Sequence, residues 1–157
     1  MPKPIHIIVA CSENRVIGRA GHLPWSIPED TAFFQGQTRG HTVIMGRHSF
    51  EEWPSAGKER DVVVVTHEPL EGVACAPTLA EAIARAQRLR GDVYLCGGQR
   101  VYEEGLPLAG RLYLTLVHAE LPGDRFFPDW RAEFPREVSR RESQDANWRY
   151  AFLVLER

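Results

Sequence analysis

Short apolar runs alternate with helical patterns along the first two thirds of the chain. Apolar runs of this length predict strands, and they lie at residues 5–11, 42–45, 62–66, 93–96, 112–117 and 150–155. Helical periodicity lies between them at residues 28–38, 47–53, 78–89 and 100–106, and Thr78 with Glu81 forms a capping box at the start of the third. This alternation is typical of βαβ units, which build a mostly parallel sheet with helices on both faces. After residue 117 only strand-like segments follow, so we expect antiparallel strands at one edge of the sheet.

The length and charge of the chain limit its size and its partners. With 157 residues, 43% of them apolar, we expect a single domain over residues 1–157 with a core of ordinary size. The 19 Lys and Arg residues are balanced by 21 Asp and Glu residues, giving a net charge of −2, so no general positive field favours nucleic acid. Near the C-terminus, arginines alternate with glutamates at Arg136, Glu137, Arg140, Arg141 and Glu142. We interpret that pattern as a solvated strand face.

The cysteines and the N-terminal apolar run indicate a cytoplasmic chain. Cys11, Cys75 and Cys96 are an odd number without metal-type spacing, so we expect reduced, buried thiols and no metal site. The run at residues 5–11 is too short to span a bilayer, and the residues before it lack the layout of a secretory signal. We therefore expect a soluble cytoplasmic protein without membrane contacts. No exposed apolar stripe stands out, which favours a monomer.

The segment around Asp30 places a carboxylate among apolar side chains. Ser26 can cap a helix and Pro28 suits its first turn. Helical spacing then aligns one face, made of Ile27, Asp30, Thr31, Phe34 and Thr38, and directs Glu29 to solvent. An acid buried among such neighbours, with Trp25 just before the helix, is costly without a partner, and a flat ligand with N–H donors would provide one. The alternative is that Asp30 only complements the helix dipole.

Two strand-to-helix junctions carry glycines and are suited to anions. The first is Gly46 followed by Arg47, His48 and Ser49, and the second is the pair Gly97 and Gly98. Ligands of open α/β sheets bind beyond the carboxyl ends of the strands, where both junctions should lie. Two phosphate-binding ends indicate a dinucleotide, and the cations Arg47, His67 and Arg100 favour NADPH over NADH. The alternative for each junction is an ordinary tight turn.

Six groups of residues, in order along the chain, resemble the dihydrofolate reductase family. They are Val16-Ile17-Gly18, Leu23-Pro24-Trp25 with Asp30, Val43-Ile44-Met45-Gly46-Arg47, Gly97-Gly98 with Arg100-Val101-Tyr102, Leu112-Tyr113-Leu114-Thr115, and Phe127-Pro128. The resemblance covers essentially the whole chain. It implies a three-layer α/β sandwich with a central, mostly parallel eight-stranded sheet, antiparallel at its C-terminal edge, and about four flanking helices. It also implies that NADPH reduces 7,8-dihydrofolate to 5,6,7,8-tetrahydrofolate, with hydride transfer to C6 and protonation of N5, in support of one-carbon metabolism and thymidylate synthesis.

The resemblance also implies roles at the substrate end. Asp30 would accept hydrogen bonds from the pterin N3–H and 2-amino group, Thr115 would bridge the same edge and the carboxylate, and an ordered water near Trp25 and Leu23 would protonate N5. Arg60 would bind the α-carboxylate of the glutamate tail, although a loop arginine in a charged run is the alternative. Antifolate-type inhibitors would occupy the same pocket. The expected substrate contacts are Ile8, Val9, Asp30, Phe34, Trp53, Arg60, Cys96 and Thr115.

At the cofactor end the resemblance implies a longer set of contacts and a lid. The expected contacts are Ala10, Ile17, Gly18, Gly46, Arg47, His48, Ser49, Thr66, His67, Cys96, Gly97, Gly98, Gln99, Arg100, Val101 and Tyr102. The resemblance further suggests a cis peptide between Gly97 and Gly98. Residues 14–23 resemble a mobile lid over the nicotinamide, and Gly18 with Asp124 matches a family loop contact.

Three positions depart from the family pattern, and two rival functions stay open. His67 stands where an arginine or serine is common, Cys96 where an aliphatic residue is usual, and Trp53 where the family has a smaller apolar residue. One rival is a pterin or flavin-precursor reductase of the same fold, against which the pairing of Trp25 with Asp30 argues. The other is a non-catalytic nucleotide- or folate-binding module, which the presence of Asp30, Trp25, Thr115 and Tyr102 makes less favoured.

Overall fold

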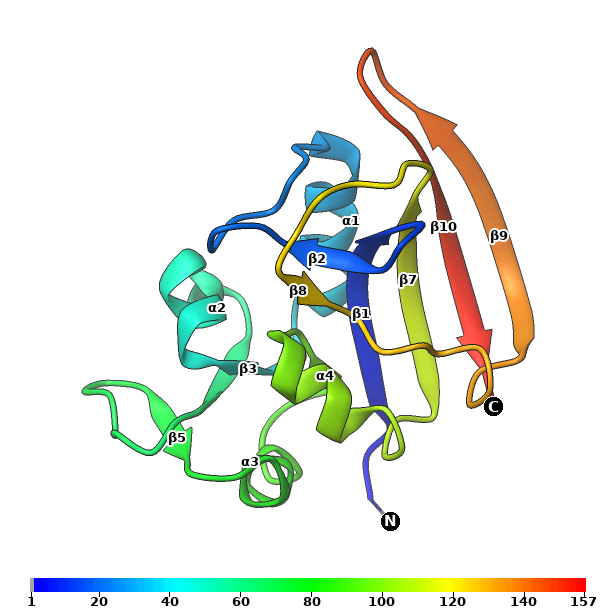
Figure 1. Cartoon of the computed structure of the whole chain (residues 1–157). Coiled ribbons are helices and arrows are strands. Elements are labelled where there is room, and N and C mark those ends of the chain that lie inside the picture. Colours follow the sequence, from blue (N-terminus) through cyan, green and yellow to red (C-terminus); the bar gives the residue numbers. More distant parts are fainter. Residues whose placement is uncertain (1) are drawn as a thin grey trace.

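An eight-stranded sheet forms the middle of the computed structural model, which describes residues 2–157 (Figure 1). Its strands are β1 (Ile5–Ser12), β3 (Thr42–Gly46), β4 (Asp61–Val65), β5 (Ala74–Ala76), β6 (Val93–Leu95), β7 (Arg111–Val117), β9 (Arg136–Gln144) and β10 (Arg149–Glu156). They lie side by side in the order β5-β4-β3-β6-β1-β7-β10-β9. Neighbours from β5 to β7 are parallel, whereas β10 is antiparallel to β7 and to β9. The predicted parallel sheet with an antiparallel C-terminal edge is confirmed.

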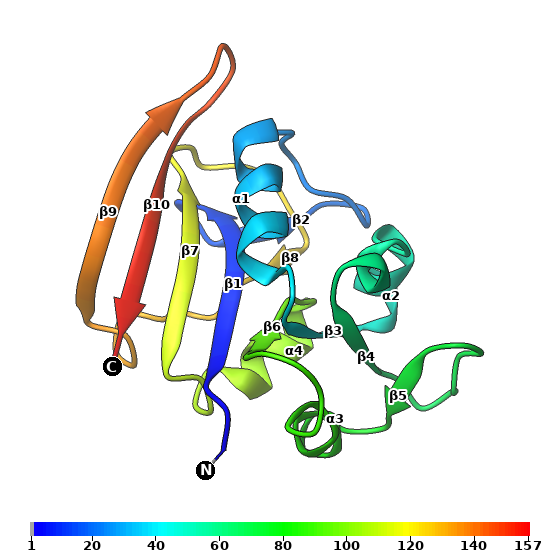
Figure 2. The ribbon, with the colours of Figure 1, turned by 180° about the vertical axis from the view of Figure 1, so that it is seen from behind.

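Helices cover both faces of this sheet, which confirms the three-layer prediction. The helices are α1 (Pro28–Thr38), α2 (Arg47–Glu52), α3 (Leu79–Ala86) and α4 (Gln99–Gly105), with a short 3-10 helix at Ala56–Lys58. Ile8 of β1 packs with the aromatic side chains of α1 and α2, whereas its neighbour Ile7 packs with α3 and α4. Figure 2 shows α1 in front of β1 and β7, and α4 lies in front of the sheet in the opposite view of Figure 1.

Three short strands were not expected from the sequence. β2 (Val16–Gly18) and β8 (Arg125–Phe126) pair antiparallel outside the main sheet, and β5 is the edge strand of the main sheet opposite β9. Strands of two or three residues leave no readable apolar run, because most of their stability comes from their neighbours. The expected capping box is half confirmed, since the Glu81 backbone N–H donates to Thr78 Oγ1 at 3.2 Å.

The start of α1 differs from its prediction in three ways. Ser26 does not cap the helix: Ile27 is the N-cap residue, no side chain caps the turn, and Ile27 is 2% exposed. Burial of Ile27 in the core therefore sets where the helix begins. Thr31 is exposed rather than part of the buried face, and Glu29 contacts β9 and β10 instead of pointing only to solvent.

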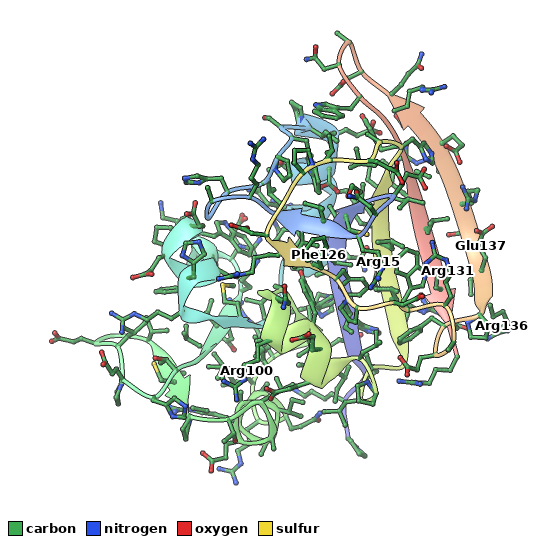
Figure 3. All side chains as sticks on the ribbon, viewed as in Figure 1. Arg15, Arg100, Phe126, Arg131, Arg136 and Glu137 are labelled. Atoms are coloured by element: carbon green, nitrogen blue, oxygen red, sulfur yellow. The ribbon has the colours of Figure 1, made fainter. Side chains whose placement is uncertain are left out.

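The edge strand β9 confirms the predicted solvated strand. Eight of its nine residues are exposed, and Figure 3 shows Arg136 and Glu137 extending from it at the outer edge of the sheet. Charges on both faces protect such an edge from pairing with another chain. Cys11 is buried while Cys75 and Cys96 are half-buried, and all three are free. Across residues 2–157, no helix is long and apolar enough to cross a membrane.

A histidine held between two carboxylates gives a testable pH dependence of stability. His118 Nδ1 lies 2.9 Å from Glu13 Oε1, and its Nε2 lies 2.8 Å from Glu142 Oε1. Hydrogen bonding to Glu13, with a further contribution from Glu142, raises the pKa of His118 above its ordinary 6.5. A raised histidine pKa stabilises the fold fully below about pH 6.5, and that contribution is lost as the pH rises through the folded-state pKa. We expect the urea midpoint of the wild type to fall over this interval.

The matched variant is His118→Gln, which keeps a hydrogen-bonding side chain and carries no proton-dependent charge. Its urea midpoint is expected to lie below that of the wild type near pH 6 and to approach it near pH 9. Parallel curves for the two proteins across this range would contradict the bridging role.

Candidate active site

Asp30 lies in the first turn of α1 and faces the sheet. Its Oδ1 accepts a hydrogen bond of 2.6 Å from Thr115 Oγ1 on β7. Burial is the main cause that raises the pKa of Asp30; the Thr115 hydrogen bond opposes it, and the charge of Glu29 adds to it. Among residues 2–157, nothing donates to the second oxygen, Oδ2. The structure therefore presents a half-buried carboxyl group, one oxygen of which is held by Thr115 while the other has no donor among these residues.

Trp25 and Leu23 lie just before this helix but differ in exposure. The side chain of Trp25 is 6% exposed and packs beside Ile27 and Val117, whereas Leu23 is 57% exposed. The indole Nε1 of Trp25 is buried and has no hydrogen-bond partner within the described part of the chain. Since buried N–H groups normally have partners, this N–H is a candidate donor to a small polar group near Asp30.

The apolar wall expected to bind substrate comes from one face of β1 and from α1 and α2. Ile8 packs with Phe34, Trp53 and the end of β6 at Cys96, and the Phe34 and Trp53 rings meet at 5.1 Å, edge to face. Burial raises the pKa of the Cys96 thiol, so it stays protonated and unreactive. The side chain of Val9, by contrast, lies on the opposite face among residues of α3 and α4, so only its backbone is available at the site.

A hollow of about 260 Å³ lies at the outer end of this wall. Its lining residues are Gln35, Trp53, Ser55, Lys58, Glu59 and Arg60. Arg60 is only 3% exposed; its Nη1 donates to Ala56 O at 2.9 Å and its Nη2 to Gln35 O at 3.2 Å. Its guanidinium also lies 4.5 Å from the centre of the Trp53 ring, and its buried Nε has no partner within residues 2–157. A rigidly held guanidinium with an unused donor fits a carboxylate.

The two glycine junctions lie next to each other at the carboxyl ends of β3 and β6. The Gly46 N–H donates to Gly97 O at 2.8 Å, and the peptide between Gly97 and Gly98 is cis, as the family resemblance suggested. Gly97 has φ +107, and a Cβ there would lie 3.3 Å from Tyr102 Oη and 3.4 Å from Ser49 Oγ. This backbone therefore requires glycine, and it leaves room for close approach of a ligand.

Tyr102 joins the second junction to β1. Its Oη donates to Ile8 O at 2.9 Å, and burial keeps its pKa well above 10.0. Ala10 follows on the face of β1 that packs beside α1. Val101 lies on the other side, buried in the core formed with α3, so its side chain supports α4 rather than lining the site.

The cations expected to bind a ribose phosphate lie at the surface beside acids. Arg47 Nη1 donates to Glu68 at 3.1 Å, and Arg100 Nε donates to Glu104 at 2.7 Å. Thr66 also bonds Glu68, and His67 is exposed beside it. These groups follow the carboxyl ends of β3, β4 and β6, which is the end of the sheet where Gly46 lies. Exposed ion pairs are weak, so these side chains can exchange their acidic partners for a phosphate.

The remaining cofactor candidates contact the lid segment and its partner strand. His48 Nε2 lies 3.0 Å from Gly21 O, and Gln99 Oε1 accepts from the Phe126 N–H at 2.8 Å. Phe126 lies where β8 runs beside β2, on the side that faces the viewer in Figure 3. Gln99 therefore holds β8 rather than projecting freely.

The predicted contact between Gly18 and Asp124 is present. The Asp124 N–H donates to Gly18 O at 3.0 Å, and Asp124 Oδ2 accepts from the Ala20 N–H at 3.2 Å. A Cβ on Gly18 would meet Arg125 Cβ at 3.4 Å, so the two segments are in close contact. Ile17 is half-buried against the main core. The segment at residues 14–23 is thus tied to β8 at its middle.

Sequence reasoning missed Glu29 and the hollow around Arg60. Gln35, Ser55 and Lys58 line that hollow without any local signal. Glu29 binds residues more than a hundred positions away, and only the pairing register of β9 with β10 would have placed them together.

Comparisons with known proteins agree with this geometry. A sequence model of the family described as dihydrofolate reductase matches residues 4–157. The chain is 38% identical over 139 residues to a dihydrofolate reductase type 3 of Salmonella typhimurium, covering 87% of this chain and 85% of that protein. It is 32% identical over 161 residues to a dihydrofolate reductase of Bacillus subtilis, covering 98% and 94%. A solved dihydrofolate reductase from Enterococcus faecalis, complexed with NADP(H) and RAB-propyl, superposes with a TM-score of 0.84 at 30% identity, covering 98% of this chain and 96% of that one.

Proposed function

The chain belongs to the dihydrofolate reductase family, and we propose that it reduces 7,8-dihydrofolate to 5,6,7,8-tetrahydrofolate with NADPH. The observation that carries the proposal is the half-buried Asp30 carboxyl group, which Thr115 orients and which lies one helical turn before Phe34 of the apolar wall. When bound, NADPH supplies the hydride that C6 of the substrate accepts.

The protein's contribution at the pterin end is to bind and orient. Asp30 accepts hydrogen bonds from the N3–H and 2-amino group, and Thr115 fixes the carboxylate that receives them. Ile8 and Phe34 pack on the ring and exclude water from it. Holding the ring in one orientation is itself a large part of catalysis, because a flat ligand otherwise has many unproductive positions.

Proton delivery to N5 does not come directly from Asp30. The N3 and N5 edges of a pterin lie apart, so a carboxyl group that binds N3 cannot also reach N5. The buried Nε1 of Trp25 and the exposed Leu23 border the segment where an ordered water would hold that proton. Burial raises the pKa of Asp30, and the charge of this carboxyl group acts at the N3 edge of the ring rather than at N5.

The glycine junctions fit a dinucleotide with two phosphate groups. Gly97 and Gly46 leave backbone room beside Ser49, and the surface cations Arg47, His67 and Arg100 would face the ribose phosphate together with Thr66. His48 and Gln99 would hold the lid and β8 over the same ligand. These residues would bind and position the cofactor.

The proposed function is tested by the loss of nicotinamide absorbance in purified protein. Dihydrofolate with NADPH is expected to give rapid loss, and NADH a much slower one. A flavin-precursor pyrimidine in place of dihydrofolate is expected to give none. Saturable NADPH binding without any loss on adding dihydrofolate would contradict the proposal and favour another pterin-like substrate or a binding module.

A substitution at Gly97 tests, independently of the substrate, whether the glycine junctions bind the cofactor. Gly97→Ala places a methyl group 3.3 Å from Tyr102 Oη in a backbone conformation that L-residues rarely adopt. We expect NADPH affinity to fall by about tenfold or more, in line with a strain of 1–3 kcal/mol. The control is Gly36→Ala on α1, where a Cβ meets nothing within 4 Å. Equal NADPH affinity in the Gly97 variant, measured by titration, would place the cofactor elsewhere.

The proposal extends to the setting of the enzyme. It includes antifolate-type inhibitors as ligands of the Asp30 pocket, a monomeric single domain, a cytoplasmic location and no nucleic-acid partner. The supports are the net charge of −2 and three free cysteines.

A further inference from the structure

The first turn of α1 carries a second acid, Glu29, which faces away from the pterin site. Its Oε1 accepts hydrogen bonds from Ser143 Oγ at 2.6 Å and from Tyr150 Oη at 2.7 Å, and its Oε2 accepts one from Arg141 Nη1 at 2.9 Å. These donors lie on β9 and β10, strands that the reaction does not otherwise use. Three donors on one half-exposed carboxylate are more than a solvated glutamate acquires by chance.

The strand register shows how this contact relates to Asp30. Thr115 of β7 lies opposite Phe152 of β10, which lies opposite Arg141 of β9. Tyr150 and Ser143 form a pair two residues further along the same face of the sheet. Adjacent carboxylates of α1 thus attach one helical turn to neighbouring rows of a single sheet, Asp30 through β7 and Glu29 through β9 and β10.

That turn has few other polar contacts to hold it. No side chain caps α1, and Pro28 cannot donate a backbone hydrogen bond. The buried side chain of Ile27 fixes its inner side. Glu29 supplies the polar contacts of its outer side.

We propose that Glu29 is a positioning residue for the reductase reaction: it fixes the first turn of α1 on β9 and β10, and with it the orientation and charge of Asp30. The role rests on the proposed function, since it acts through the carboxylate that binds the pterin. Glu29 itself touches neither substrate nor cofactor.

Electrostatics supports the same role. Hydrogen bonds from Ser143 first, then from Tyr150 and Arg141, hold the pKa of Glu29 at about 2, so it is ionised wherever the enzyme works. Its charge is one cause of the raised pKa of Asp30. The other titratable and charged groups that face the pair are Tyr102 on α4 and Tyr150 on β10, whose pKa values are raised chiefly by burial, and Arg141 on β9, which donates to Glu29. Asp30 is therefore a neighbouring group whose pKa the Glu29 charge raises.

Two variants separate the positioning of Asp30 from the effect of the Glu29 charge. Glu29→Gln keeps an acceptor and removes the charge, so we expect the KM for dihydrofolate to rise about threefold to tenfold and the pH midpoint of kcat/KM to fall by about half a unit. Tyr150→Phe removes one donor and keeps the charge, so we expect a smaller rise in KM with the midpoint unchanged. Glu137→Gln on exposed β9 is the matched control, with neither effect expected.

The outcomes distinguish this role from the proposed function. A folded Glu29→Gln protein with the KM and pH profile of the wild type would overturn the positioning role. If Glu29→Gln fails to fold, Tyr150→Phe and Ser143→Ala decide the matter, and an unchanged KM in both would overturn it. A wild type that binds NADPH but does not turn over dihydrofolate would count against the proposed function instead. Equilibrium binding of dihydrofolate then still tests Glu29, because a positioning role predicts weaker binding in Glu29→Gln.

Discussion

Replacing Asp30 by asparagine is expected to leave NADPH affinity intact and to reduce turnover of dihydrofolate at neutral pH by about a hundredfold or more. Asparagine has nearly the same shape, but it presents an amide in place of a charged acceptor to the N3–H and 2-amino donors of the pterin. The nearby hydroxyl of Thr115 would lose its charged acceptor as well. Steady-state kinetics with both ligands, together with an NADPH titration, measures the two effects separately.

The stability of the same variant shows whether a loss of turnover comes from misfolding. Burial raises the pKa of Asp30, so the ionised form is disfavoured in the fold, and this cost is present above the folded-state pKa and absent below about pH 3.8. Asp30→Asn is therefore expected to be as stable as the wild type at neutral pH, or more stable. The control is Asp129→Asn, an exposed acid in the segment after β8 that pairs with Arg131, for which turnover is expected to stay unchanged. Unchanged turnover in a folded Asp30→Asn enzyme would contradict the role given to the carboxylate.

Replacing Arg60 by lysine is expected to raise the KM for dihydrofolate by about a hundredfold while kcat changes little. Lysine cannot reproduce the fork that bonds Ala56 and Gln35 while leaving Nε for a ligand, and it loses the stacked contact with Trp53. Truncating one partner of a buried charged contact costs about 2–5 kcal/mol, which covers the expected loss. The tail lies away from the reacting ring, so the effect belongs to binding.

The substrate itself supplies the sharpest control for Arg60. Dihydropteroate has the same ring system without the glutamate tail, so its KM is expected to be equal in the wild type and in Arg60→Lys. Lys58→Gln, beside the same hollow but exposed, is the matched protein control, with a smaller rise expected. An equal loss for both substrates would show that Arg60 supports the fold of the hollow rather than the tail carboxylate.

The sheet could be predicted from the sequence because its inner strands are continuous apolar runs. Such runs, however, do not reveal which side chain faces which helix. In β1 every residue from 7 to 9 is apolar, and Val9, which the family resemblance assigned to the substrate, packs its side chain beside α3 and α4. The short β2 and β8 left no run to read, since two or three residues carry no periodicity.

Site residues that belong to a sequence motif could be predicted. Site residues that are brought together only by contacts between distant parts of the chain could not. Asp30 and Thr115 were paired by resemblance to the family, and their hydrogen bond is present. Arg60 stands in a charged run that reads as surface, yet the fold buries it against Trp53. Glu29 reads as a solvated acid, because its partners lie 112 to 121 residues away, two on the polar strand β9 and one on β10. Only the register of β9 and β10 brings these donors to one carboxylate.

The most direct test follows the hydrogen itself. NADPH carrying deuterium on the transferred position of its nicotinamide ring is mixed with the enzyme and 7,8-dihydrofolate, and the product is examined by mass spectrometry and NMR. The proposed function predicts one deuterium at C6 of tetrahydrofolate for each NADPH consumed, with the N5 hydrogen coming from solvent. Consumption of NADPH without deuterium at C6, or no tetrahydrofolate despite saturable binding of both ligands, would contradict it.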